Sequence, residues 1–235
     1  MSLLDRRATV WLNFCLDNLL PSFLRDSKLL MWPLMRLVLG PMWREFANFK
    51  GRASYLSSKE LTEIYQRLAS SHLPRETDLH PSCVRLICDR VVGDKILDVG
   101  CGRGYLTGLL DRVAGRKVVG LDINPPKGPF EGQLTYCCGQ VSLLPFADSV
   151  FDTVICAHTL EHVVDLRSAI RELRRVAKRR LIIIVPRQRP YLFTFDLHLH
   201  FFPYPYLLDL LMGAPVPTCK IVGGDLYYEE EIHLR

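Results

Sequence analysis

The stretch ILDVGCGRGYLTGLL, residues 96–110, constrains the fold of the 235-residue chain more than any other segment. A short apolar run passes through Asp98, and three glycines follow at alternate positions, Gly100, Gly102 and Gly104, before a helical pattern begins. Glycine permits a tight turn here and lets a ligand approach the backbone at the positive end of a helix. The stretch therefore predicts a strand, a ligand-binding loop and a helix, in that order.

The spacing of the glycines excludes two common nucleotide sites. A dinucleotide loop reads G-x-G-x-x-G, whereas Tyr105 occupies the position of its third glycine, and no G-K-[ST] follows to make a phosphate-binding P-loop. Asp98 beside the loop would repel a pyrophosphate. Asp122 closes the next apolar run, where a carboxylate suits the hydroxyls of a ribose. An adenosine-containing cation fits both acids.

From about residue 78 to the end, short apolar runs alternate with helical patterns. The runs expected to form strands are KILDVG, KVVGLDI, LTYCC, FDTVICA and RLIIIVP, and the intervening helices include YLTGLLDRVA and DLRSAIRELRRVAK. Strands separated by helices need crossover connections, which predict an α/β fold with a Rossmann-like, doubly wound, mostly parallel sheet. The tail is expected to close as a hairpin around Gly223 and Gly224.

Residues 1–77 are expected to form a separate helical extension before the α/β domain of residues 78–235. The helices are predicted in VWLNFCLDNLL, SKLLMWPLMRLVLGPMW and SSKELTEIYQRLASSHL, the last with Ser58 as its cap. Pro33, Arg36 and Pro41 interrupt the second segment, which is shorter than the roughly 20 residues that a membrane-spanning helix needs. The extension is interpreted as a lid, a peripheral membrane contact or a dimer contact.

Composition indicates a folded protein in a reducing environment. Hydrophobic residues make up 49% of the chain and charged residues 23%, and a net charge of +5 does not demand a nucleic-acid partner. The eight cysteines form no C-x-x-C pair, so buried thiols in the cytoplasm are expected rather than disulfides or a zinc knuckle. No secretory signal is apparent. The basic run RELRRVAKRR, read as a solvated helix face, also permits contact with a membrane surface.

The segment HTLEH, residues 158–162, matches the H-x-x-E-H spacing of some zinc-dependent proteases. Such a site needs both histidines on one face of a helix. The apolar run FDTVICA ends directly before His158, which places the motif on a loop after a strand. No metal site is therefore expected.

Three segments in order resemble the motifs of class I S-adenosylmethionine-dependent methyltransferases: LDVGCGRG, VVGLDI and LPFADSVFDTVICAHTLEHV. The group that they resemble acts on small molecules and includes the ubiquinone and menaquinone enzymes, and the resemblance covers roughly residues 80–190. It implies S-adenosylmethionine as cofactor. It also implies that the methionine end would lie at Asp98, Gly100, Cys101 (mainly through its backbone) and Gly102.

The same resemblance implies that Asp122 binds the ribose and Ile123 packs on the adenine. Gln140 and Val141 stand where the family usually has an acid that contacts the adenine amino group. The glutamine carbonyl is still able to accept that hydrogen bond.

The acceptor is expected to be a small molecule, a lipid-like compound or a sugar, methylated on oxygen or carbon. The chain has CAHT after the fourth predicted strand, without the N/D-P-P-Y/F motif of amino-group methyltransferases or the Pro-Cys nucleophile of RNA cytosine-5 enzymes. His158 and His162 are the candidate bases for an acceptor that must lose a proton, and lining the pocket is the alternative role for each. The second hypothesis for the whole chain is a cofactor-binding scaffold or partner subunit that methylates nothing. A homodimer is a further expectation.

Overall fold

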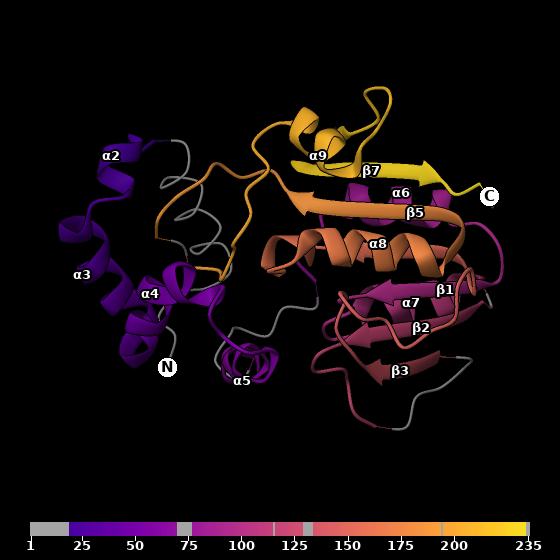
Figure 1. Ribbon diagram of the computed structural model, residues 1–235, viewed down its shortest axis with the longest axis horizontal. Coiled ribbons are helices and arrows are strands. Elements are labelled where there is room, and N and C mark those ends of the chain that lie inside the picture. The colour runs from indigo at the N-terminus through magenta and orange to yellow at the C-terminus, as the bar shows by residue number, and fades with distance from the viewer. Residues whose placement is uncertain (1–18, 70–76, 115, 129–133, 194, 234–235) are drawn as a thin grey trace. The chain divides into compact units, whose positions relative to one another are not determined.

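The computed structural model describes residues 19–69, 77–114, 116–128, 134–193 and 195–233 (Figure 1). The chain divides into two compact units, one of Met1–Arg75 with Gln188–Phe201 and one of Glu76–Arg187 with Phe202–Arg235. The predicted boundary after residue 77 lies close to the first division. The segment 188–201, however, groups with the amino-terminal helices. The first predicted helix, VWLNFCLDNLL, lies mostly outside the described residues.

The second unit is built on a mostly parallel seven-stranded sheet with the order β3-β2-β1-β4-β5-β7-β6. Strands β1 to β5 are parallel to one another, and β7 and β6 are antiparallel additions at one edge. The α/β class, the five predicted parallel strands and the closing hairpin are confirmed. The strands are β1 (Lys95–Val99), β2 (Lys117–Asp122), β3 (Leu134–Cys138), β4 (Phe151–Ala157), β5 (Ala177–Pro186), β6 (Lys220–Val222) and β7 (Asp225–Glu231).

Helices cover both faces of this sheet, which makes it doubly wound (Figure 1). One core joins the sheet to α8 and α9 through Leu173 and Leu208, and the other joins it to α6 and α7 through Ile87 and Leu110. The central strands β1, β4 and β5 carry buried residues on both faces, as expected for parallel strands between two layers of helices. The helices are α6 (Pro81–Arg90), α7 (Tyr105–Ala114), η2 (Leu160–His162), α8 (Leu166–Val176) and α9 (Pro205–Met212).

The basic run RELRRVAKRR is divided between a helix and a strand, so its reading as one helix face was wrong. Helix α8 ends at Val176, and Lys178, Arg179 and Arg180 lie in β5. Two of the three arginines that the run contributes to α8 make side-chain ion pairs: Arg174 Nε lies 2.6 Å from a Glu230 oxygen, and Arg175 Nε lies 2.7 Å from a Glu172 oxygen. A pattern of charges alone does not show where a helix stops when the next strand begins without a loop.

The first unit contains α2 (Ser22–Arg25), α3 (Lys28–Leu39), η1 (Gly40–Met42), α4 (Trp43–Ala53) and α5 (Ser58–Ala69). The cap of α5 is Ser57 and not Ser58. The Glu60 N–H donates to Ser57 Oγ (3.3 Å), and the Ser57 N–H donates to Glu60 Oε2 (2.8 Å), which is a reciprocal capping box. Where two serines adjoin, sequence alone does not distinguish which one leaves the helical conformation.

The segment 188–201 supplies aromatic side chains to the core of the first unit. Phe193 and Phe195 pack in one cluster with Phe46 and Phe49 of α4. The buried Arg25 guanidinium donates to the Phe193 carbonyl and lies 4.6 Å from the centre of the Tyr191 ring. Several of the aromatic residues after β5 therefore stabilise the core of the first unit. Among the described residues, no helix has the length and apolarity needed to cross a bilayer.

Candidate functional site

The backbone N–H groups at the start of the glycine loop are engaged within the protein. Those of Gly100 and Cys101 donate to the Leu121 carbonyl, at 2.7 and 3.1 Å, and that of Gly102 donates to a carboxylate oxygen of Asp122 at 2.9 Å. A phosphate-binding loop keeps such donors for its ligand. The arrangement therefore disfavours a pyrophosphate and agrees with a ligand that carries positive charge.

The three glycines of the loop differ in what an added side chain would meet. A Cβ on Gly100 (φ +76°) would lie 1.9 Å from Thr159 Oγ1, and one on Gly104 (φ +79°) would lie 1.9 Å from the Tyr136 hydroxyl. A Cβ on Gly102 (φ +52°) would meet no described atom within 4 Å. Gly102 therefore faces open space, and it is the point at which a ligand is able to approach the backbone closely.

Asp98 lies at the inner end of this loop and is buried. Its carboxylate accepts a hydrogen bond from the Thr107 hydroxyl at 2.6 Å. Burial raises the pKa of Asp98 to about 6, the hydrogen bond from Thr107 opposes this, and the charge of Asp122 adds to it. A cation bound beside the loop would favour the ionised carboxylate. Asp98 thus suits a positively charged ligand on electrostatic grounds.

Asp122 ends β2 and is held in a fixed orientation. One carboxylate oxygen accepts from Gly102, and the other accepts from the Asn124 N–H at 2.8 Å. The carboxylate oxygens have further lone pairs, so this side chain is still able to accept hydroxyl groups of a ligand. The bond to Gly102 links the acid directly to the glycine loop.

The residues predicted near the adenine follow neighbouring strands of the sheet. Asp122 pairs with Cys138 of β3, and the Gly139 N–H donates to the Asp122 carbonyl at 3.0 Å. Half-buried Ile123 follows β2, and half-buried Gln140 follows β3. Val141, in contrast, is buried and packs in the core of the second unit. Ile123 and Gln140 thus follow the ends of two paired strands at one edge of the sheet, and their contact with the adenine stays a prediction from the resemblance.

His158 is the first residue after β4, and it faces an acid that the sequence did not indicate. Its Nε2 lies 3.4 Å from Asp225 Oδ2, an ion-pair distance without hydrogen-bond geometry. Burial lowers the pKa of His158, but the carboxylates of Asp225 and Glu161 outweigh burial, so that the pKa is raised. Asp225 opens β7 opposite Pro186, at the carboxyl end of β5. The hairpin around Gly223 and Gly224 was predicted, but its pairing with β5, which brings Asp225 to this edge, was not.

The backbone of His158 is left-handed, with φ +48°. Few residues other than glycine adopt this conformation, and it is found more often at functional sites. The next residue, Thr159, donates its hydroxyl to the Ala157 carbonyl at 3.0 Å and packs against Gly100. The segment that begins at His158 therefore lies beside the glycine loop.

The segment HTLEH does not have the helical context of a protease zinc site. Residues Leu160–His162 form η2, a three-residue 3₁₀ helix, and His158 belongs to the turn before it. Glu161 is buried and His162 is half-buried. The two histidines therefore do not project from one face of an α-helix, which the protease motif requires.

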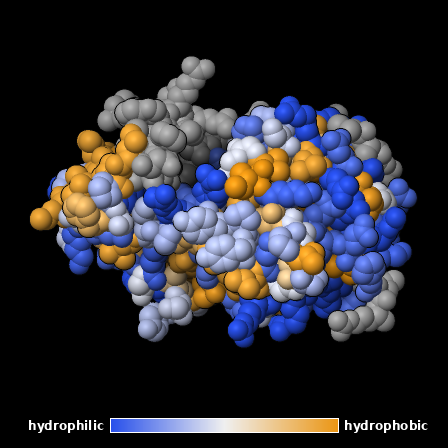
Figure 2. All heavy atoms as spheres, turned by 90° about the horizontal axis from the view of Figure 1, so that it is seen from above, coloured by the Kyte–Doolittle hydropathy of each residue, from blue (hydrophilic) through white to orange (hydrophobic). Residues whose placement is uncertain are grey.

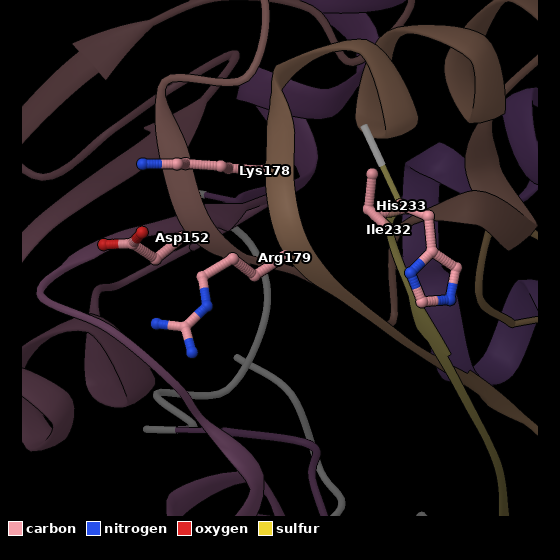
Figure 3. A pocket seen from close by; sticks show the side chains of 5 residues that line it. All are labelled: Asp152, Lys178, Arg179, Ile232 and His233. Atoms are coloured by element: carbon pink, nitrogen blue, oxygen red, sulfur yellow. The ribbon is translucent and has the colours of Figure 1, made fainter. Parts of the chain in front are cut away.

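A pocket elsewhere in the second unit is lined by Asp152, Lys178, Arg179, Ile232 and His233 (Figure 3). Asp152 stands near the start of β4, and the two basic residues stand near the start of β5. This pocket thus lies at the amino ends of parallel strands, whereas the glycine loop, Asp122 and His158 lie at carboxyl ends. Ligands of open α/β sheets bind at the carboxyl ends, which is where we place the candidate site.

Comparisons with known sequences match the part of the chain that contains the glycine loop and the segment after β4. Residues 97–185 match the family model described as a methyltransferase domain. The chain is 37% identical over 97 residues to a ubiquinone biosynthesis O-methyltransferase of Methylococcus capsulatus, an alignment that covers 37% of this chain and 40% of that protein. It is 34% identical over 92 residues to a demethylmenaquinone methyltransferase of Corynebacterium urealyticum, covering 38% of this chain and 40% of that protein. The chain thus spans about two fifths of these relatives.

Solved structures share the fold at low sequence identity. A chain from the complex between the Haloferax volcanii Trm112 methyltransferase activator and a methyltransferase aligns with a TM-score of 0.55 at 14% identity, covering 76% of this chain and 99% of that one. The PH0226 protein from Pyrococcus horikoshii aligns with a TM-score of 0.51 at 17% identity, covering 65% of this chain and 88% of that one. These likenesses concern the fold alone.

Proposed function

We propose that the chain, whose residues 97–185 match a methyltransferase domain, is a class I S-adenosylmethionine-dependent methyltransferase and transfers a methyl group from this cofactor to a small-molecule acceptor. The observation that carries the proposal is the glycine loop, with its N–H groups engaged internally and Asp98 and Asp122 beside it. A loop of this kind favours a cationic ligand with a ribose over a nucleotide phosphate.

The residues are assigned to the cofactor as follows. Asp98, the backbone of Gly100 and Cys101, and Gly102 would hold the methionine end, where Gly102 leaves space for it. Asp122 would accept the ribose hydroxyls. Ile123 would pack on the adenine and Gln140 would accept from its amino group, whereas Val141 would support this wall from the core.

When bound, the cofactor supplies a methyl group already activated on a sulfonium. The protein therefore contributes mainly orientation and proximity. His158 is proposed to take a proton from an acceptor hydroxyl or acidic carbon, with Asp225 stabilising the charged imidazole. His162 is proposed to line the acceptor pocket, and its role as a base is the alternative.

A quinone-type acceptor is the finer part of the proposal. The support is that several of the matched relatives are named for ubiquinone, menaquinone or phytyl-naphthoquinone methylation. Oxygen or carbon is the proposed target atom. The segment 1–77 is proposed to restrict access as a lid, with contact to a second copy or to a membrane as the other roles for the same helices.

Calorimetry with S-adenosylmethionine and with its demethylated product tests the cofactor assignment. We expect both to bind the full chain, and we expect Asp122→Ala to lose roughly 10- to 100-fold in affinity because a charged hydrogen-bond acceptor is removed. Gly108→Ala, inside α7 where the added Cβ meets no described atom within 4 Å, serves as a control for handling and folding. Absence of binding by the wild type would refute the proposal.

Turnover is tested separately with a panel of hydroxylated quinones, catechols and sugars. Methylated product, detected by mass, is the expected result. Tight cofactor binding without product from any member of the panel would favour the scaffold hypothesis instead.

A further inference from the structure

The first unit exposes an apolar face on α2 and α3 that has no cover among the described residues. Leu29 is 91% exposed, Phe23 73% and Leu37 72%. Leu24, Leu30 and Trp32 are also exposed and complete this apolar face of α2 and α3. Hydrophobic residues gather at the left of the surface in Figure 2, the side on which Figure 1 draws these two helices. Single exposed leucines are ordinary, but a contiguous set of this kind marks an interaction surface.

Helix α3 is apolar on its inner side as well. Met31 and Met35, one turn apart, are fully buried in the core of the first unit. The exposed leucines are thus not needed for packing inside the unit. A helix that is apolar all round is normally covered on every side. Something other than the described residues of this unit is therefore expected to cover the outer side of α3.

The charges on this face are all positive. The sequences of α2 and α3, SFLR and KLLMWPLMRLVL, contain no aspartate or glutamate, and Lys28 and Arg36 are exposed. Asp26, between the helices, accepts a hydrogen bond from the Leu192 N–H at 2.6 Å. The Lys28 ammonium lies 5.5 Å from the centre of the Trp32 ring. A helix that lies in the surface of an anionic bilayer typically combines leucine and tryptophan with basic residues and has few acidic ones.

We propose that the apolar face of α2 and α3 docks this protein on the surface of an anionic lipid bilayer. The helices would lie in the plane of the headgroups, with leucine side chains below it and Lys28 and Arg36 at the level of the lipid phosphates. At 12 residues, α3 is about 18 Å long, whereas the hydrocarbon layer is about 30 Å thick. It is therefore too short to cross.

Two other occupants fit the surface less well. A second copy of this chain, placed on the same face by a two-fold axis, would bring Lys28 and Arg36 of both copies together, with no acid on the face to pair them. A protein partner normally makes about one hydrogen bond per 100–200 Å² of interface. Outside its two cations, the exposed part of α3 offers leucine, tryptophan and proline side chains.

The test is sedimentation of the full chain with vesicles of phosphatidylglycerol and, separately, of phosphatidylcholine. We expect binding to the anionic vesicles and little to the neutral ones. Leu29→Gln combined with Leu37→Gln should weaken binding at least about tenfold, because two inserted side chains lose apolar burial. Lys28→Gln combined with Arg36→Gln should weaken it by about fivefold per charge. Leu210→Gln, at a leucine of α9 that is 71% exposed, is the matched control and should bind normally.

Insertion is measured independently through tryptophan fluorescence with brominated lipids. Quenching is expected for the wild type and should fall in Trp32→Phe. A wild type that stays in the supernatant, or binding that survives both double substitutions, would overturn the proposal. So would a dimer in lipid-free solution that Leu29→Gln with Leu37→Gln converts to monomer, because a second copy would then cover the face. Calorimetric cofactor binding by the same variants shows that they are folded and keeps this outcome separate from that of the proposed methyl transfer.

Discussion

Asp98 illustrates how one buried acid links stability to ligand binding. Its pKa is raised to about 6, chiefly by burial, against an ordinary value of 3.8. The folded chain therefore holds this proton more tightly than the unfolded chain. As pH rises from about 4 through 6, the free energy of unfolding falls, and above pH 6 the ionised group is a constant cost. A bound cation would offset that cost.

Asp98→Asn should therefore stabilise the free protein at pH 7 while impairing cofactor binding. The expected gain is on the order of 1–3 kcal/mol in the free energy of unfolding, from urea denaturation at pH 7, and none at pH 3. The wild-type affinity for S-adenosylmethionine should fall up to about tenfold between pH 7 and pH 5, as Asp98 takes up its proton. An affinity with the same pH dependence in wild type and variant would contradict this account.

The pair of His158 and Asp225 leads to a second prediction, in which an ionised group stabilises the fold instead of destabilising it. The pKa of His158 is raised in the folded state, because the neighbouring carboxylates outweigh burial. The pair therefore contributes stability that is complete below the pKa of unfolded histidine, about 6.5, and is lost as pH rises through the higher folded value. In Asp225→Asn, the pKa of His158 measured by NMR should fall. An unchanged His158 titration would show that Asp225 does not act on it.

The glycine loop is an element in which neighbouring glycines serve different purposes. Gly100→Ala should destabilise the fold by about 1–3 kcal/mol, because its Cβ would collide with Thr159 in addition to the left-handed φ. In Gly102→Ala the added Cβ faces open space, so the free energy of unfolding should fall by only about 1 kcal/mol, because of the left-handed φ. Cofactor affinity should nevertheless fall steeply in Gly102→Ala, because the methyl group occupies the approach to the backbone.

Thermal denaturation and calorimetry on the two variants separate stability from binding. Gly108→Ala, a glycine inside α7 with no described atom within 4 Å of its added Cβ, is the control. It should slightly stabilise the helix and leave binding intact. If Gly102→Ala bound the cofactor as well as Gly108→Ala does, the loop would not be the binding element.

The strands of the sheet were predictable because each one is marked by a pattern of neighbouring residues in the sequence. Each parallel strand contains a short stretch that is rich in apolar residues, and the glycines that follow β1 mark the end of that strand clearly. The end of α8 was predicted too late, because Ala177 and Lys178 are compatible with a helix as well as with a strand. The pairing of His158 with Asp225 was not predicted at all. It depends on the register of β7 against β5, which no local pattern specifies.

The molecule as a whole consists of two units with separate cores. The methionines of α3 and the phenylalanines of α4 pack with Phe193 and Phe195, whereas the sheet has cores of its own on each face. Sequence order concealed this arrangement, because residues 188–201 follow β5 directly and yet group with the amino-terminal helices. Aromatic residues of this segment pack in the core of the first unit. No periodic pattern in the segment indicates that packing.

Because the residues that we assign to the cofactor all belong to the second unit, cofactor binding should stabilise that unit selectively. At a concentration of the demethylated cofactor about 100 times its dissociation constant, the free energy of unfolding of the second unit should rise by about 2.7 kcal/mol. Hydrogen exchange measured by mass spectrometry should slow in β1, β2 and the glycine loop, and should not change in α3 and α4. Equal protection of these helices would mean that the first unit closes on the bound cofactor, as a lid does. Protection in neither unit would place the cofactor elsewhere and refute the assigned site.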